Sequence, residues 1–204
     1  MSYRKTKKVE EKLKSKRAAI IAAGKEVLAE GGYTKAGIKN IAQKAGIATG
    51  TFYLYFANKD KLVETIAEEM YQKLLQRIKE ERAKYTSTMD KLQASMRTCV
   101  QVFSDEQQLA KILLIQAPGI SKILNHKLIN IEKELVLLSK MDLDELVAEG
   151  HLPEQDTYIS ACAFVGTFRQ VIISWLREGQ PENLMECYDA LVEYNLRGLG
   201  QDGK

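Results

Sequence analysis

Helical periodicity along nearly the whole chain is the feature that most constrains its fold. Apolar residues recur three and four positions apart, as Leu62, Ile66, Met70 and Leu74 do, which places them on one face of a helix. Only 3 prolines and 13 glycines interrupt the pattern. The sequence therefore predicts an all-α protein, with helices over about 15–30, 38–44, 49–56, 59–84, 88–103, 105–116, 121–149, 154–178 and 182–198.

Charge is distributed unevenly along the chain. Residues 1–62 hold 14 Lys and Arg against 5 Asp and Glu, a net charge of +9, whereas the whole chain carries only +3. The remaining residues are therefore acidic, with a net charge of −6. A basic head on an acidic body suggests that the head meets a polyanion. A solvated, lysine-rich tail that only aids solubility is the alternative, and charge alone does not separate the two.

The order of the helices predicts three parts. Residues 1–14 are polar and basic and are expected to form a mobile arm. Residues 15–60 are expected to form a compact head of three helices, which continues into a fourth helix as far as about residue 75. Residues 61–204 are expected to form a larger helical body.

Cysteine usage and hydropathy indicate the compartment. The three cysteines, Cys99, Cys162 and Cys187, are too few and too widely spaced for a disulfide framework or a zinc site. We interpret them as reduced thiols of a cytoplasmic protein. The N-terminus carries charges where a signal peptide needs an apolar stretch. The most apolar run, 158–176, contains Arg169 and Gln170, so it is expected to be too polar for a membrane span.

No group of residues in the sequence indicates catalysis. The chain lacks a nucleophile elbow, a P-loop, a dinucleotide-binding glycine motif and an H-E-x-x-H motif. His126 and His151 stand alone on different segments, without a second ligand at helical spacing. We therefore expect no enzyme activity, no metal site and no cofactor. A redox role for the cysteines is less favoured than a buried apolar one, since no cation closely flanks Cys162 or Cys187.

Residues 38–56 have the pattern of a helix-turn-helix unit. Ala42, Ala45 and Gly46 keep the first helix small where the second must cross it closely. Phe52 and Phe56 lie one turn apart and are expected to point into the core. The other side of the second helix is then left for contacts outside the chain. In such units the N-terminal residues of the second helix read base edges, while phosphates are held around it.

The segment IAQKAGIATGTFYLYFANKDKL, residues 41–62, resembles the DNA-binding domain of the TetR/AcrR family of bacterial transcription regulators. The strong resemblance covers about residues 15–75. Residues 163–199 more loosely resemble the last two helices of the family, which usually pair two subunits. The family pattern is matched at Ala45-Gly46-Ile47, Gly50-Thr51, Phe52-Tyr53, Tyr55-Phe56 and Asn58-Lys59-Asp60.

The resemblance implies roles for individual residues of the head. Thr49, Gly50 and Thr51 are expected to lie nearest the base edges. Tyr53, Tyr55 and Lys59 are expected to hold phosphates, and the basic arm could reach along the backbone or into a minor groove. The family usually has a threonine at the start of the second helix, where this chain has Gly37, so the capping hydroxyl is absent. Lys39 could supply a phosphate contact instead.

The resemblance also implies an N-terminal DNA-binding domain followed by a helical ligand-binding and dimerisation domain. Such a homodimeric repressor would be released from a palindromic operator by a small effector. The apolar body indicates an apolar or amphipathic effector, although the same residues could simply be core. The YLYF run at 53–56 resembles family members that respond to fatty-acyl compounds. Periodicity over 154–199 predicts that the dimer interface contains Phe168, Ile172, Trp175, Leu184, Tyr188 and Leu191. The alternative is that these residues face only the core of their own subunit.

Two other functions remain open from the sequence. The chain could be a helical scaffold or adaptor whose basic head binds an acidic protein. It could also be an architectural protein that binds DNA without sequence preference. Salt-sensitive binding to duplex DNA would exclude the first, and a high ratio of specific to nonspecific affinity would exclude the second.

Overall fold

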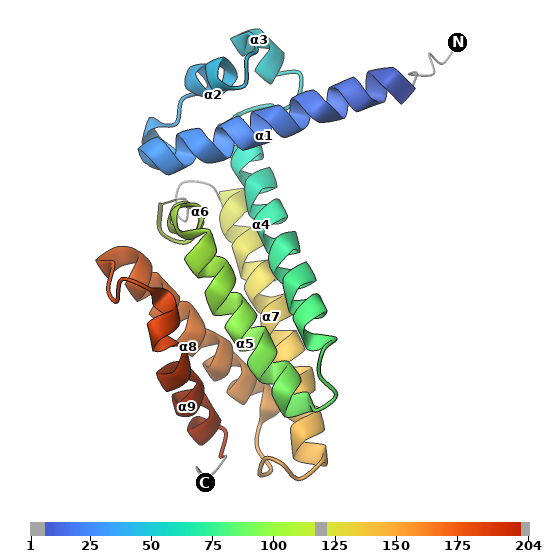
Figure 1. The fold of residues 1–204 in the computed structure, drawn as a ribbon, viewed down its shortest axis with the longest axis vertical. Helices are drawn as coiled ribbons and strands as arrows, with labels where there is room; N and C mark the ends of the chain where they lie inside the picture. The colour runs from blue at the N-terminus through green and yellow to red at the C-terminus, as the bar shows by residue number, and fades with distance from the viewer. Residues whose placement is uncertain (1–6, 117–121, 201–204) are drawn as a thin grey trace.

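The head lies at one end of a long helical molecule (Figure 1). The computed structural model describes residues 7–116 and 122–200, and over these ranges it contains helices and no strand. The all-α prediction is therefore confirmed. The helices α1 (Lys7–Lys35), α2 (Ile38–Lys44) and α3 (Thr49–Phe52) form the head, with α2 and α3 on the far side of α1 from the body. The long helix α4 (Lys59–Arg82) runs from the head into the body.

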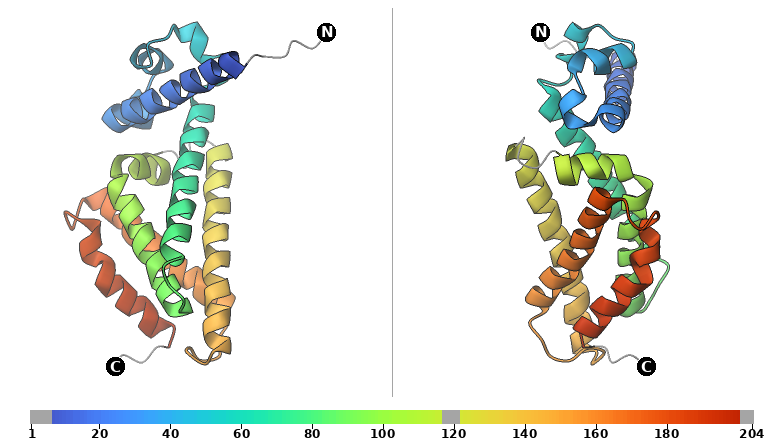
Figure 2. Two further views of the ribbon diagram at one scale, coloured as in Figure 1. Left: turned by 45° about the vertical axis from the view of Figure 1, so that its right-hand side comes forward. Right: turned by 90° about the vertical axis from the view of Figure 1, so that its left-hand side faces the viewer.

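The body is built around α4. Helix α5 (Thr88–Asp105) packs along α4, and α7 (Lys122–Ala148) lies beside both (Figures 1 and 2). The short helix α6 (Gln107–Lys111) and the π-helical turn η1 (Ile112–Gln116) lie at the end of the body that faces α1. Helix α8 (Thr157–Glu178) packs on α7. The 3₁₀ turn η2 (Leu184–Cys187) and α9 (Tyr188–Gly198) close the outer side of the body.

Local capping explains where several helices begin and end. The Asn58 side chain accepts a hydrogen bond of 2.9 Å from the Lys61 amide and so caps the start of α4. Helix α2 has the predicted bounds and ends at Gly46, whose φ of 65° favours glycine. The amides of Gly46 and Ile47 donate to the carbonyls of Gln43 and Ala42, which completes a Schellman motif.

The first helix is longer than the sequence predicted. Helix α1 begins at Lys7, so residues 7–14 are helical and not an arm; residues 1–6 lie outside the described residues. The segment from Lys7 to Ala23 contains neither proline nor glycine and is rich in Lys, Glu and Ala, which favour helix. Helix α1 extends to Lys35 across a kink at Gly32, where φ is 70°. In contrast, α3 ends at Phe52 rather than Phe56.

Helix α8 corrects the expectation on membrane spans. By length and composition alone it could cross a bilayer, with a mean hydropathy of 1.4 over its most apolar window. The single charge of Arg169 is too little to exclude a membrane span. The core helix of a soluble protein meets the same criteria, and α8 contributes Ala161, Phe164 and Leu176 to the buried core of the body. Packing buries 39% of this window, and a single helix of this kind is weak support for a span.

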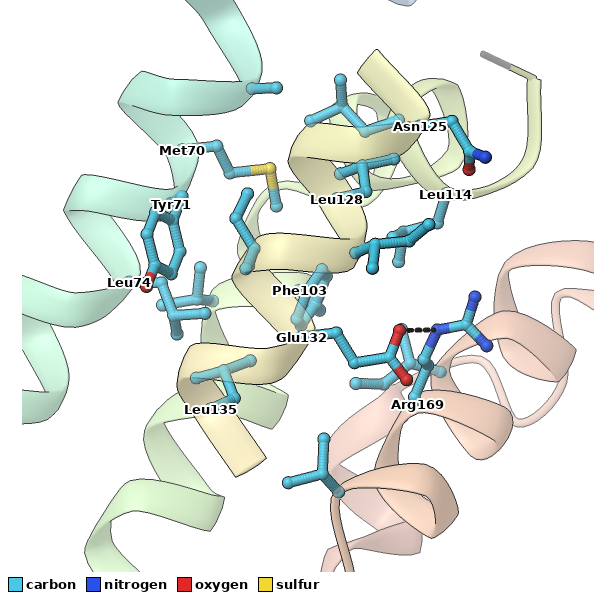
Figure 3. A pocket seen from close by; sticks show the side chains of 17 residues that line it. Met70, Tyr71, Leu74, Phe103, Leu114, Asn125, Leu128, Glu132, Leu135 and Arg169 are labelled. Carbon is cyan, nitrogen blue, oxygen red and sulfur yellow. Dashed lines mark ion pairs between the residues drawn. The ribbon is translucent and has the colours of Figure 1, made fainter. Parts of the chain in front are cut away.

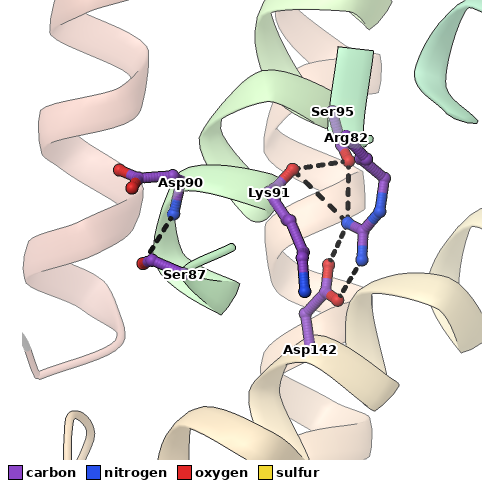
Figure 4. A network of polar contacts seen from close by, with 6 residues as sticks. All are labelled: Arg82, Ser87, Asp90, Lys91, Ser95 and Asp142. Atoms are coloured by element: carbon purple, nitrogen blue, oxygen red, sulfur yellow. Dashed lines mark hydrogen bonds and ion pairs between the residues drawn. The ribbon is translucent and has the colours of Figure 1, made fainter. Parts of the chain in front are cut away.

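An ion pair joins three helices of the body at the end of α4 that lies far from the head in Figure 1, and Figure 4 shows its contacts. The Arg82 guanidinium at the end of α4 donates two hydrogen bonds of 2.6 Å to the Asp142 carboxylate on α7. It also donates to the Ser95 hydroxyl on α5 at 3.0 Å. The Asp142 side chain is 5% exposed, so its charge depends on Arg82 for compensation.

We predict that Arg82→Ala lowers the free energy of unfolding by about 3–5 kcal/mol, because it leaves the Asp142 carboxylate buried without a partner. Arg77→Ala is the matched control, since Arg77 pairs with Asp105 at 2.9 Å in an exposed position. That pair should contribute only about 0–1 kcal/mol. Urea unfolding measures the free energy of unfolding of both variants. Equal losses would show that the Arg82–Asp142 pair stabilises the protein no more than an exposed surface pair does.

Candidate nucleic-acid interface and ligand cavity

The aromatic pair of the helix-turn-helix unit anchors the unit on the core of the head. The rings of Phe52 and Phe56 are buried, with centroids 5.8 Å apart, as the sequence predicted. Burial of these rings fixes which side of α3 faces outward. Thr49 and Gly50 are exposed at the start of α3, Thr51 is half-buried, and Lys39 is exposed on α2. A Cβ built at Gly50 would contact nothing within 4 Å, so the surface there is open.

The residues that follow α3 differ in exposure. Tyr53 is 54% exposed, whereas Tyr55 is half-buried and packs against the core, which is less exposed than the sequence suggested. Leu54 between them is 81% exposed, and sequence reasoning did not single it out. Leu54 does not share the helical face of Phe52 and Phe56, and this spacing could have identified it as exposed. A leucine exposed beside the recognition helix can contact a thymine methyl group.

Lys59 has a partner inside the chain. Its Nζ donates a hydrogen bond of 2.7 Å to the Tyr33 carbonyl and lies 4.1 Å from the centre of the Tyr33 ring. The Tyr33 hydroxyl is hydrogen-bonded to the Asp60 carboxylate, and desolvation together with that carboxylate raises the pKa of Tyr33. These contacts fasten the end of α1 to the start of α4. A lysine at this position therefore needs no external anion to explain it, and phosphate contact by Lys59 stays a prediction.

Gly37 occupies the N-cap of α2 without a side-chain hydrogen bond. Its φ of −86° is one that any residue adopts, and a Cβ built there would meet nothing. The fold thus leaves room for a threonine at this position, although the chain has none.

The body contains a cavity of about 180 Å³ between α4, α5, η1, α7 and α8 (Figure 3). Its lining is mostly apolar. The lining residues that Figure 3 labels are Met70, Tyr71, Leu74, Phe103, Leu114, Asn125, Leu128, Glu132, Leu135 and Arg169.

Two polar contacts lie in the wall of this cavity. Arg169 Nε on α8 lies 3.4 Å from Glu132 Oε2 on α7, and both side chains are almost half exposed (Figure 3). Arg169, whose role the sequence left open, therefore pairs with an acid of its own chain. The Tyr71 hydroxyl on α4 is hydrogen-bonded to Glu134, and its pKa is raised by desolvation and by this carboxylate. The cavity thus combines a large apolar surface with a few polar groups, as ligand sites do.

The residues predicted for the dimer interface are buried inside their own chain. All six belong to the core, each with an exposed fraction of 8% or less, so they cannot offer a face to a partner. Ile172 lines the ligand cavity. The periodicity was correctly recognised, but it arises from burial within the subunit. On the same two helices, Tyr158, Ile159 and Tyr194 are the large apolar side chains that are exposed.

The lone histidines and cysteines do not form a site in the described part of the chain. No three His, Cys, Asp or Glu residues converge there as metal ligands. The His151 amide donates to the Leu146 carbonyl at 2.9 Å, which places this residue at the end of α7, as predicted. Burial raises the pKa of the Cys99 thiol to about 12, so this cysteine is a poor nucleophile.

Known proteins share the sequence of the head and the fold of the whole chain. Residues 20–66 match the family model "Bacterial regulatory proteins, tetR family". The fatty acid metabolism regulator protein of Bacillus subtilis is 25% identical over 181 residues, which cover 88% of this chain and 93% of that protein. These relatives are transcriptional regulators and not enzymes.

Two solved structures are similar over most of their length. The fatty acid degradation regulator FadR of Bacillus halodurans matches with a TM-score of 0.78 and 26% identity, over 89% of this chain and 98% of that one. FadR of Bacillus subtilis, solved in complex with stearoyl-CoA, matches with a TM-score of 0.79 and 25% identity over the same shares. Residues 20–66 therefore form a DNA-binding domain of the TetR type, and the chain is a ligand-responsive, DNA-binding transcriptional regulator.

Proposed function

We propose that this regulator is a cytoplasmic, homodimeric repressor that a long-chain acyl thioester such as stearoyl-CoA releases from a palindromic operator. The observation that carries the proposal is the apolar cavity with the Arg169–Glu132 pair in its wall. Its support from known proteins is the similar structure that was solved with stearoyl-CoA. Residues 15–60, continuing to about 75, act as the DNA-binding unit, and residues 61–204 bind the effector and dimerise.

The cavity suits an acyl chain attached to a polar group. Each methylene that leaves water for the apolar lining contributes about 0.8 kcal/mol. Arg169 is the one cation among the described lining residues, and it can donate a hydrogen bond to the neutral carbonyl oxygen of a thioester. Glu132 beside it repels a free carboxylate. An acyl thioester therefore fits this wall better than the corresponding fatty acid does.

The size of the cavity connects binding to movement. Its volume of about 180 Å³ is smaller than ordinary ligand sites, which occupy about 300–1,000 Å³. A long acyl chain must therefore push the surrounding helices apart. Because α4 forms one wall and also enters the head, this displacement changes the position of the head.

Stearoyl-CoA should weaken operator binding by about 5–150-fold, the usual range of coupling between two sites. Operator fragments are first selected from genomic DNA with the purified protein. Gel-shift titrations then compare stearoyl-CoA with stearate and with CoA alone, which should have far smaller effects. If saturating stearoyl-CoA leaves the operator affinity unchanged, the effector assignment is wrong. Equal binding to selected and random duplexes would instead indicate an architectural DNA-binding protein.

The DNA-contact roles rest on the exposed side of the helix-turn-helix unit. Thr49, Gly50 and Thr51 approach base edges, and Leu54 adds an apolar contact. The groups proposed to hold phosphates are Lys39, Tyr53, Tyr55 and Lys59.

Gly50→Ala separates folding from DNA contact. The new Cβ meets no atom of the chain, so the replacement should stabilise α3 by up to about 1 kcal/mol relative to glycine. The same methyl group should hold α3 away from the DNA and reduce operator affinity about tenfold, equivalent to about 1.4 kcal/mol. Thermal unfolding and gel shifts measure the two effects. Undiminished operator affinity would remove Gly50 from the interface.

Dimerisation uses the exposed side of α8 and α9. A single head makes too few base contacts for a unique genomic site, so two heads on a palindrome are needed. Ile159, Ala163 and Tyr194 border a shallow groove between the two helices. Gly166 lies in the middle of α8, where glycine makes a helix less stable than alanine does by about 1 kcal/mol. Among the described residues, no atom outside the local helix backbone lies within 4 Å of a Cβ built there, so the space beside Gly166 is open to a second chain.

The double variant Ile159→Glu with Tyr194→Glu should be monomeric at micromolar concentration, because it buries two charges in a self-complementary interface. Its affinity for the operator should fall at least about a hundredfold as the two heads separate. Leu137→Glu, at an exposed apolar residue of α7, is the matched control and should stay dimeric. Sedimentation measures the assembly; a dimeric double variant or a monomeric parent protein would contradict the assignment.

A further inference from the structure

The π-helical turn η1 connects the ligand cavity to the head. Leu113 and Leu114 of this turn line the cavity. Gln116, its last residue, accepts a hydrogen bond of 2.9 Å through Oε1 from the Tyr33 amide in the head. The two residues are 83 positions apart in the sequence, so this contact exists only in the folded chain. Only Ile115 thus stands between the cavity-lining Leu114 and the residue that bonds directly to the head.

The contact at Gln116 is closely fitted. Gly32, which precedes Tyr33, has a φ of 70° and interrupts the helical geometry of α1. A Cβ built on Gly32 would lie 2.8 Å from Gln116 Oε1 and 3.3 Å from Gln116 Nε2. The backbone conformation favours glycine here, and a Cβ at this position would force the end of the Gln116 side chain to shift. A shift of η1 cannot leave this junction unchanged.

Tyr33 connects this junction to the other helices of the head. Its hydroxyl is bonded to Asp60 and its carbonyl accepts from Lys59, both in the first turn of α4. The Ala36 amide, two residues before α2, donates to the Gly32 carbonyl at 3.1 Å. Gln116 thus holds the point at which α1, α2 and α4 meet.

We infer that Gln116 is a positioning residue that transmits occupancy of the cavity to the DNA-binding head through its hydrogen bond to the Tyr33 amide. The inference rests on the proposed function for the identity of the ligand. An acyl chain that displaces Leu113 or Leu114 moves η1, and the Gln116 side chain then leaves the Tyr33 amide. A π-helical turn is a strained element often found at functional sites, which suits it to shift between two arrangements. The ligand thereby favours the arrangement in which this bond is broken.

The first test compares Gln116→Leu with Gln116→Glu. Leucine keeps the approximate size of the side chain but removes the acceptor, whereas glutamate keeps an oxygen at Oε1. The coupling factor is the ratio of operator Kd values with and without saturating stearoyl-CoA. It should fall about 3- to 10-fold in Gln116→Leu, in line with the net contribution of one hydrogen bond. It should stay near the parent value in Gln116→Glu. Equal coupling in Gln116→Leu and the parent protein would overturn the inference.

The second test needs no ligand, so it distinguishes failure of this inference from failure of the proposed effector. Leu114→Trp fills the cavity beside η1 and should change operator affinity in the parent protein. In the Gln116→Leu background, Leu114→Trp should change operator affinity 3- to 10-fold less than it does in the parent protein. A double-mutant cycle measures this difference. Additive effects would overturn the inference even if stearoyl-CoA regulates the protein. Circular dichroism and thermal unfolding of each variant establish that it is folded.

Discussion

Burial of a single apolar stripe along α4 is the interaction on which the rest of the structure depends. Leu62 and Ile66 are fully buried in the upper part of this stripe, and Leu74 and Ile78 are buried lower in the body. Helix α1 lies so close that a Cβ built on Gly24 would be 2.8 Å from the Leu62 side chain. One helix about 36 Å long, at 1.5 Å per residue, therefore contributes to one continuous core that extends from the head into the body. Movement of the body is coupled to movement of the head while this core remains packed.

The ligand cavity lies along α4 between the buried ion pair at one end of this helix and the head at the other. Arg82 fixes the far end of α4 to Asp142, and Asn58 caps the end at the head. Met70 and Tyr71 line the cavity between these two ends. In the proposed function, a ligand that expands the cavity pushes on the middle of α4, and the head at the start of this helix moves with it.

Periodicity predicted which residues are buried but not what buries them. The bounds of α2 and the N-cap at Asn58 followed from local chemistry, which the sequence states directly. The apolar stripe that contains Phe168 and Leu191 is buried, as its periodicity indicated. However, the sequence pattern of such a stripe is the same whether its own subunit or a second subunit covers it. Contacts between distant residues were not predictable, because spacing carries no information about them. The bonds of Tyr33 to Lys59 and Gln116 belong to this class.

The Arg169–Glu132 pair makes only a small contribution to the stability of the fold. Both side chains are almost half exposed and the charged atoms are 3.4 Å apart, so the pair adds little to the stability of the fold. Neither charge is needed to hold α7 against α8, since these helices already share an apolar interface that includes Leu143 and Ala161. A pair that folding does not require, placed in the wall of an apolar cavity, remains free to exchange partners. In the proposed function, Arg169 uses that freedom, because it can turn from Glu132 to the polar group of the ligand at small cost.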